Sequence, residues 1–225
     1  LLKDNNSEIQ KAAELNQLEI VYCLLSNSTR VSENLFRNLE KLEKVVIPPS
    51  ITSIDDNAFM NCALLTGVVI PHSVTSIGTG AFCGCKSLKA IAIPSSVTTI
   101  GSGAFEFCSS LNQISLPFSL CCVERNLFAY CCSLETVEIP PMAEKIKFEA
   151  FYGCRALREV TIPASVRVIE HNAFCACEAL EAVNVPPSVE KIEVGAFAGC
   201  RSLQNLEIQA TTKADNEFIM WGGCT

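Results

Sequence analysis

The sequence predicts a β-rich solenoid, in which short parallel strands stack coil upon coil along one axis. Three observations predict it: a 23-residue unit repeats, each unit carries an alternating apolar strand pattern, and the units follow one another without insertions. A unit of this length cannot bury its own apolar side and must stack on its neighbours. An apolar residue followed by Phe marks the period at 35–36, 58–59, 81–82, 104–105, 127–128, 150–151, 173–174 and 196–197.

Each coil contains two strand signals. The first is Leu-x-x-Val/Ile-x-Ile/Leu/Val-Pro, in which proline ends the strand because it lacks an N–H for the ladder. The second is a short apolar pair such as Val97 and Ile100, and Gly-x-Gly segments at 78–80 and 101–103 permit the chain to turn back. We therefore expect parallel strands on the concave face, and short strands and turns without α-helices on the convex face. Seven full coils begin at Leu42, Leu65, Leu88, Leu111, Leu134, Leu157 and Leu180.

The pattern divides the chain into three parts. Residues 1–41 are predicted to form an N-terminal cap with a degenerate repeat, residues 42–202 the seven full repeats, and residues 203–225 a degenerate final repeat and C-terminal cap. In the last part, Trp221 of Trp-Gly-Gly-Cys is expected to cover the open end of the core.

The N-terminal cap is expected to contain a short helix followed by an imperfect strand. Asn6 or Ser7 is placed to cap the helix, with Glu8 in its first turn. Tyr22 and Leu24 occupy the strand phase of the first full coil, which predicts the strand. The helix is predicted from residues spaced for one face, namely Ile9, Ala12, Ala13 and Leu18.

Charge and hydropathy exclude two classes of partner. The chain has 24 acidic and 17 basic residues and a net charge of −7, whereas binding through phosphates needs clustered Lys and Arg. No apolar run reaches the roughly eighteen residues needed to cross a bilayer. We expect no nucleic-acid partner and no membrane insertion by this segment.

Half of the fourteen cysteines form a ladder of one thiol per coil, three positions after each core Phe. Stacked coils are about 4.8 Å apart, within the range that a disulfide can bridge. An odd number of rungs cannot pair completely, so we interpret these cysteines as small buried apolar residues, with a disulfide ladder as the alternative. They are Cys62, Cys85, Cys108, Cys131, Cys154, Cys177 and Cys200.

The residues predict no catalytic, metal or cofactor site. His72 and His171 are four coils apart, roughly 20 Å at the strand spacing. The recurring Ser of the Ser-Val pairs fits turn hydrogen bonds better than a nucleophile. In Cys83-Gly-Cys85 and in the Cys-Ala-Cys segment at 175–177, one member belongs to the inward ladder, which opposes a tetrahedral metal site.

The phase Leu-x-x-Ile-x-Ile-Pro-x-Ser-Val-x-x-Ile-x-x-x-Ala-Phe-x-x-Cys-x-x, from Leu88 to Ser110, resembles the BspA-like (treponemal-type) leucine-rich repeat. The resemblance covers residues 42–202 in full and implies a leucine-rich-repeat solenoid. Several proteins of this family are surface proteins that bind matrix components, host cells or other microbes, so the resemblance makes adhesion a candidate function. It transfers no catalytic residue, because the shared motif is core.

The predicted partner-binding surface is the strand-lined concave face, through which solenoids bind. Its outward positions are small and apolar in coils one to three, and polar and acidic in coils four to eight, where coil eight is the degenerate final repeat. The alternative is that β-branched residues there merely suit a strand. The predicted partner-binding residues are Val46, Val69, Ala92, Ser115, Glu138, Glu159, Thr161, Asn184 and Glu207.

Three aromatic residues form a secondary partner-binding candidate. Phe107, Tyr130 and Tyr152 follow the core Phe in three successive coils. Aromatic side chains are common anchors at interfaces. The alternative is that they pack under a neighbouring turn.

These observations predict a non-catalytic scaffold that binds a protein along its concave face. The alternative is an exported cell-surface adhesin that binds host or matrix surfaces. Unpaired cysteines favour the cytoplasm, whereas two glycosylation sequons beginning at Asn5 and Asn27 favour the cell surface. The sequence names neither the partner protein nor the oligomeric state.

Overall fold

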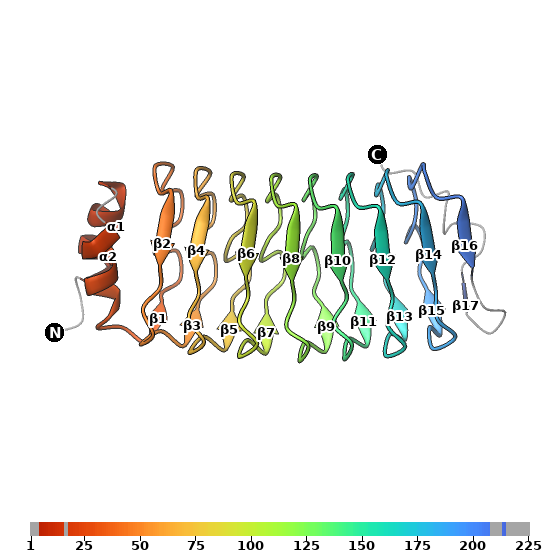
Figure 1. Cartoon of the computed structure of the whole chain (residues 1–225), viewed down its shortest axis with the longest axis horizontal. Helices are drawn as coiled ribbons and strands as arrows, with labels where there is room; N and C mark the ends of the chain where they lie inside the picture. The colour runs from red at the N-terminus through yellow and green to blue at the C-terminus, as the bar shows by residue number, and fades with distance from the viewer. Residues whose placement is uncertain (1–4, 16–17, 208–212, 215–225) are drawn as a thin grey trace.

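The computed structural model describes residues 5–15, 18–207 and 213–214, which form a row of coils stacked behind two helices (Figure 1). The helices are α1 (Asn5–Glu14) and α2 (Leu18–Leu25). Every coil contributes one three-residue strand and one two-residue strand, and turns join them. A parallel solenoid of about seven 23-residue turns was the predicted fold class, and the structure confirms it.

The three-residue strands form the wall that was predicted to be the concave face. All their pairings are parallel, and each residue faces the equivalent residue of the next coil, as Val45 faces Val68. They pair in the orders β2-β4 and β6-β8-β10-β12-β14-β16. The strands are β2 (Lys44–Val46), β4 (Gly67–Val69), β6 (Ala90–Ala92), β8 (Gln113–Ser115), β10 (Thr136–Glu138), β12 (Glu159–Thr161), β14 (Ala182–Asn184) and β16 (Asn205–Glu207).

The two-residue strands form a second wall, also parallel, with the orders β1-β3-β5-β7 and β9-β11-β13-β15-β17. The last pairing is one residue short of the repeat period, because Lys191 faces Lys213. The strands are β1 (Arg30–Val31), β3 (Ser53–Ile54), β5 (Ser76–Ile77), β7 (Thr99–Ile100), β9 (Cys122–Val123), β11 (Lys145–Ile146), β13 (Val168–Ile169), β15 (Lys191–Ile192) and β17 (Lys213–Ala214).

A column of phenylalanines occupies the centre of the solenoid. The eight rings from Phe36 to Phe197 are fully buried, and neighbouring ring centroids lie 4.9–5.8 Å apart. The backbone joins the same positions. The N–H of each Phe from Phe36 to Phe174 donates to the carbonyl of the residue before the next Phe, over 2.7–3.1 Å, as Phe59 does to Ala81. The coil spacing thus satisfies the backbone and the ring contacts together.

The ladder cysteines are buried free thiols, as the sequence predicted, and they also donate hydrogen bonds. Cys62 Sγ lies 2.9 Å from the Phe36 carbonyl oxygen, and the other six sulfurs make the equivalent contact at 3.1–3.2 Å. Cysteine therefore fills a small apolar space and supplies a weak donor to a core carbonyl.

Two turn positions per coil have a left-handed backbone. Ten non-glycine residues and six glycines have φ between 54° and 74°, and six of the ten are Asn, the side chain that tolerates this region best. Gly80 and Gly103 belong to this set. The glycines that precede them, Gly78 and Gly101, have a different purpose, because a Cβ there would overlap the backbone of the preceding coil.

The predicted strand through Tyr22 and Leu24 is wrong, because this segment is helix α2. Val21 and Leu25 are buried against the first coil, and their four-residue spacing suits a helix, whereas Tyr22 is exposed. The predicted helix exists as α1 with Ile9, Ala12 and Ala13, but Leu18 begins helix α2 instead. Helix α1 begins at Asn5, so Asn6 and Ser7 lie in its first turn. The Trp221 cap lies outside the described residues.

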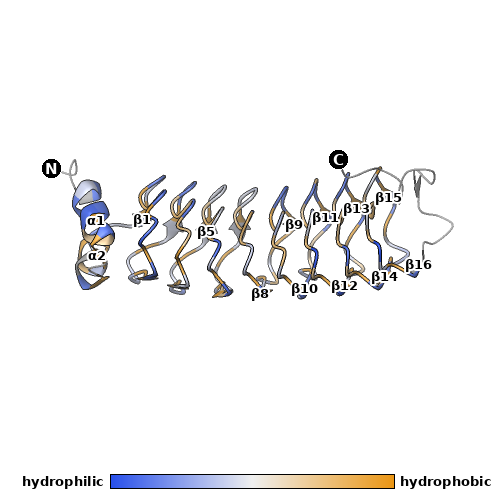
Figure 2. Ribbon diagram, turned by 90° about the horizontal axis from the view of Figure 1, so that it is seen from above, coloured by the Kyte–Doolittle hydropathy of each residue, from blue (hydrophilic) through white to orange (hydrophobic). Residues whose placement is uncertain are grey.

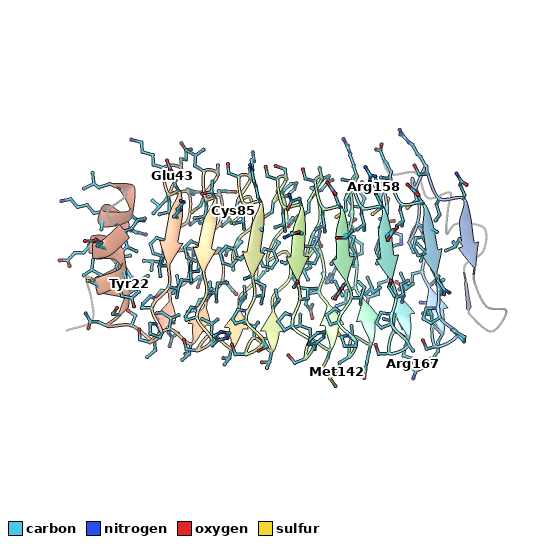
Figure 3. The ribbon with its side chains drawn as sticks, viewed as in Figure 1. Tyr22, Glu43, Cys85, Met142, Arg158 and Arg167 are labelled. Atoms are coloured by element: carbon cyan, nitrogen blue, oxygen red, sulfur yellow. The ribbon has the colours of Figure 1, made fainter. Side chains whose placement is uncertain are left out.

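Figure 2 shows that every coil carries both polar and apolar segments. Many side chains project from the two edges where the chain turns (Figure 3). In Figure 3, Glu43 and Arg158 lie along one edge, and Met142 and Arg167 lie along the other. No polar or charged side chain among the described residues is fully buried.

Truncation of one ring tests the aromatic column. Phe128→Ala should lower the free energy of unfolding by about 3–5 kcal/mol, because the buried ring touches rings on both sides. Phe118→Ala is the matched control, since the Phe118 side chain is 70% exposed, and it should change the free energy by less than about 0.5 kcal/mol. Urea unfolding followed by circular dichroism measures both, and equal losses would contradict the central role of the column.

Candidate binding surface

The outward side chains of the three-residue strands form one exposed face, which we call the strand face. In each of β2, β6, β8, β10, β12 and β14, the central residue is buried and the two flanking residues are exposed. Eight of the nine predicted partner-binding residues are therefore exposed on this face. The ninth, Glu207, ends β16, whose backbone pairs with β14. Whether these residues bind a partner stays a prediction.

The strand face changes chemistry along its length. Val46 and Val69 are 48% and 60% exposed at its N-terminal end. Glu138 faces Thr161 in register on the next strand, and Glu159 projects from that same strand. The parallel register therefore sorts apolar side chains to one half and carboxylates to the other.

A hollow of about 430 Å³ lies where the two halves meet. Its lining includes the short side chains of Ala90, Ala92 and Ser115, together with the carboxylate residue Glu138. A second hollow of about 350 Å³ adjoins it, between Phe118 and the prolines that end β10 and β12. An exposed apolar depression with a carboxylate at its rim is typical of surfaces that bind proteins.

Sequence reasoning missed a groove of about 620 Å³ along the two-residue strands β3, β5 and β7. Gly78 and Gly101 are in its lining, with Arg30, Asp55 and Glu124 around it. The Gly-x-Gly segments were the signal that could have found it, because residues without side chains leave a depression beside coils that have them. Its lining is mainly polar.

The secondary aromatic candidates contact one another. The Phe107 and Tyr130 rings stack with centroids 4.8 Å apart, and Tyr130 meets Tyr152 edge-on at 5.2 Å. Phe107 and Tyr130 remain 43% and 38% exposed, so these two rings lie on the surface and not under a turn. The structure thus joins three residues that the sequence only placed in successive coils.

The residues considered for chemistry do not converge. Among residues 5–15, 18–207 and 213–214, no group of three or more potential metal ligands comes together. Four of the five hydroxyls at the Ser-Val phase donate to carbonyls of the preceding coil, as Ser73 does to Ile51 at 2.7 Å. The fifth, on Ser188, is buried without a hydrogen-bond partner among the described residues. Twelve cysteines in the described part of the chain are free, and Cys175 is disulfide-bonded.

Burial makes the ladder thiols weak acids. It raises the pKa of Cys62 to about 12, and it raises the pKa of Cys108 and Cys131 well above the ordinary value of 9.0. The thiolate is the reactive form of cysteine, so these side chains are inert at neutral pH.

The coils match the family model of the BspA-type leucine-rich repeat region, in six copies, over residues 29–155 and 121–220. The chain therefore belongs to the BspA-type leucine-rich repeat family, whose repeat scaffolds are typically non-catalytic. No curated protein matches the chain. None of the helices among the described residues has the length and apolar character of a membrane span.

Solved bacterial structures have the same fold. A leucine-rich repeat protein of T. pallidum is 27% identical over 68% of this chain and 71% of that chain, with a TM-score of 0.60. One from Eubacterium ventriosum is 26% identical over 84% of this chain, with a TM-score of 0.70, and the chain spans 50% of its length. One from Bacteroides ovatus, 24% identical with coverages of 83% and 66% and a TM-score of 0.58, shows the fold alone.

Alkylation of the native protein tests the thiol assignment. Cys23 and Cys121 are exposed and should react with iodoacetamide at about pH 8, whereas buried Cys108 and Cys131 should react only after unfolding. Peptide mass spectrometry with and without denaturant identifies the modified residues. Alkylation of Cys108 as fast as Cys121 in the native protein would contradict the buried ladder.

Alkaline pH should destabilise the fold. The Cys62 thiol ionises near pH 9.0 in the unfolded chain but near 12 in the folded one, so the unfolded state holds fewer protons between these values and stability falls as pH rises. Urea midpoints measured from about pH 8 to 11 should therefore decline. Cys62→Ala should decline less steeply than the parent chain, and identical slopes would contradict the raised pKa.

Proposed function

We propose that the protein is a non-catalytic scaffold that binds another protein along the strand face. The observation that carries the proposal is the hollow at Ala90, Ala92 and Ser115, which opens between an apolar half and an acidic half of one exposed sheet. The preferred partner presents apolar side chains to the hollow and basic groups to Glu138, Glu159 and Glu207.

Three features support the proposal. The side chains of the strand face are not part of the core, because buried and exposed residues alternate along each strand. Its exposed valines are a contiguous apolar area of the kind that binding sites use. Family membership supports a binding scaffold, because the recurring residues of the repeat supply core and turns, while the outward strand residues differ from coil to coil of this chain.

Charge reversal tests the acidic half. Glu138→Lys, Glu159→Lys and Glu207→Lys together should weaken binding of a partner captured with the parent chain by more than tenfold, because like charges would then oppose its basic groups. Surface plasmon resonance with the purified partner measures the affinity. The matched control reverses Glu43, Glu135 and Glu181, which lie one position from the strands and carry the same charge.

Two results would contradict this assignment. Unchanged affinity in the strand-face variant removes the acidic half from the interface. Equal weakening in both variants shows that only net charge matters, and not the strand face.

The second candidate function is an exported adhesin, and the redox state of the cysteines separates the two. Disulfide-bonded Cys175 favours export, while exposed free thiols at Cys23 and Cys121 favour a reducing compartment. Thiol titration of protein purified from its source without reductant decides between them. Mostly free thiols support the intracellular scaffold, and mostly oxidised cysteines support the adhesin.

A further inference from the structure

Most left-handed turn positions of the repeat hold Asn or Gly, and three of the residues that replace them lie together on one patch of surface. The left-handed turn positions hold Asn or Gly in every coil except at four residues, which are Phe107, Tyr130, Glu149 and Ala176. The first three come from successive coils. A bulky aromatic residue with positive φ is strained, and such strain persists at functional sites when the surroundings hold it in place.

The surroundings do hold these rings. Phe107 and Tyr130 have φ of 59° and 61° and stack nearly parallel, with an interplanar angle of 9°. The Tyr130 ring then lies over Gly153, where an added Cβ would be 3.2 Å from Tyr130 Cδ1. Glycine in the next coil therefore makes room for the ring, and Tyr152 closes the row edge-on.

Two carboxylates border the rings. Glu106 is partly buried, and its pKa is raised by that burial and by the negative charge of Glu149. Burial raises the pKa of the Tyr130 hydroxyl as well, with contributions from Tyr152 and both carboxylates. Glu149 accepts hydrogen bonds from two neutral amides, Asn126 Nδ2 at 3.3 Å and Asn172 Nδ2 at 3.5 Å. None of the ion pairs in the described part of the chain includes Glu106 or Glu149.

We propose that this aromatic–acidic cluster, formed by Phe107, Tyr130, Tyr152, Glu106 and Glu149, binds an arginine side chain of a partner protein. The Phe107 ring stacks on Tyr130 with one face and has no ring contact among the described residues on the other, which offers a flat surface to a planar guanidinium. The carboxylates beside the rings accept its N–H groups. The two negative charges exclude phosphate groups. Lysine fits less well, because its ammonium is a strongly hydrated point charge that does not stack.

The cluster is distinct from the strand face. Its residues come from the turns that follow the two-residue strands β7, β9 and β11, and none of them belongs to a three-residue strand. A partner could therefore occupy the strand face while an arginine occupies the cluster, and the failure of one proposal leaves the other standing.

The test uses the full chain and small peptide probes. NMR spectra of the labelled protein are titrated with acetyl-Gly-Arg-Gly-amide and with the same peptide carrying citrulline, a neutral analogue of arginine. We expect saturable shifts at the Phe107 and Tyr130 signals with arginine, and binding at least about fivefold weaker with citrulline. The same peptide carrying lysine tests whether any cation binds equally well. Free N-acetylglucosamine tests whether the exposed rings bind a sugar instead of arginine.

Variants localise the effect. Glu106→Gln with Glu149→Gln keeps the rings and should weaken arginine binding at least about fivefold. Tyr130→Gly should abolish it while the circular dichroism spectrum stays unchanged, because Gly84, Gly153 and Gly199 occupy this turn position in other coils. Glu138→Gln with Glu159→Gln on the strand face should leave arginine binding as it is.

Any one of several results would overturn the proposal. They are the absence of saturable shifts, equal binding of citrulline and arginine, lysine binding as tightly as arginine, and sugar binding in place of arginine. Unchanged arginine binding in the Glu106→Gln, Glu149→Gln chain would likewise exclude the carboxylates.

Discussion

The structure depends on one backbone contact that repeats in every coil. The N–H of a core phenylalanine donates to the carbonyl of the residue before the next phenylalanine, as Phe82 does to Ala104 at 2.8 Å. The same step stacks the two rings and brings each ladder sulfur to a phenylalanine carbonyl. Because one translation satisfies all three interactions, an insertion in any coil would break them together. This constraint explains why the period never varies from 23 residues in the full coils.

The contact also dictates the chemistry of the turns. Keeping the coils in register requires a left-handed backbone at two places per coil, which favours Asn and Gly there. Glycine is required at positions 78 and 101 for a different reason, because the backbone of the preceding coil leaves no space for a Cβ. Turn residues are thus as constrained as the core. Phe107 and Tyr130 depart from this preference for Asn and Gly, and their aromatic rings are exposed at the surface.

Only some surface residues are free of the constraints that the core and the turns impose. Outward strand residues such as Val69 and Glu138 are exposed, so they can vary without opening a cavity in the core. The solenoid therefore separates the buried columns, which stabilise the stack, from the exposed columns, whose side chains are free to differ from coil to coil. The strand face and the aromatic–acidic cluster lie on different parts of the coil.

The sequence by itself determined the period, the parallel stacking, the buried Phe and Cys columns and the exposure of the strand face, because each is a periodic property that single side chains reveal. It failed at Tyr22 and Leu24, where helical packing against the first coil outweighed strand phase. The tertiary structure alone decided how Ala90 and Ser115 open a hollow, and that Phe107, Tyr130 and Glu149 share a patch. Such sites join residues 23 positions apart through the stacking of coils, so no local pattern in the chain describes them.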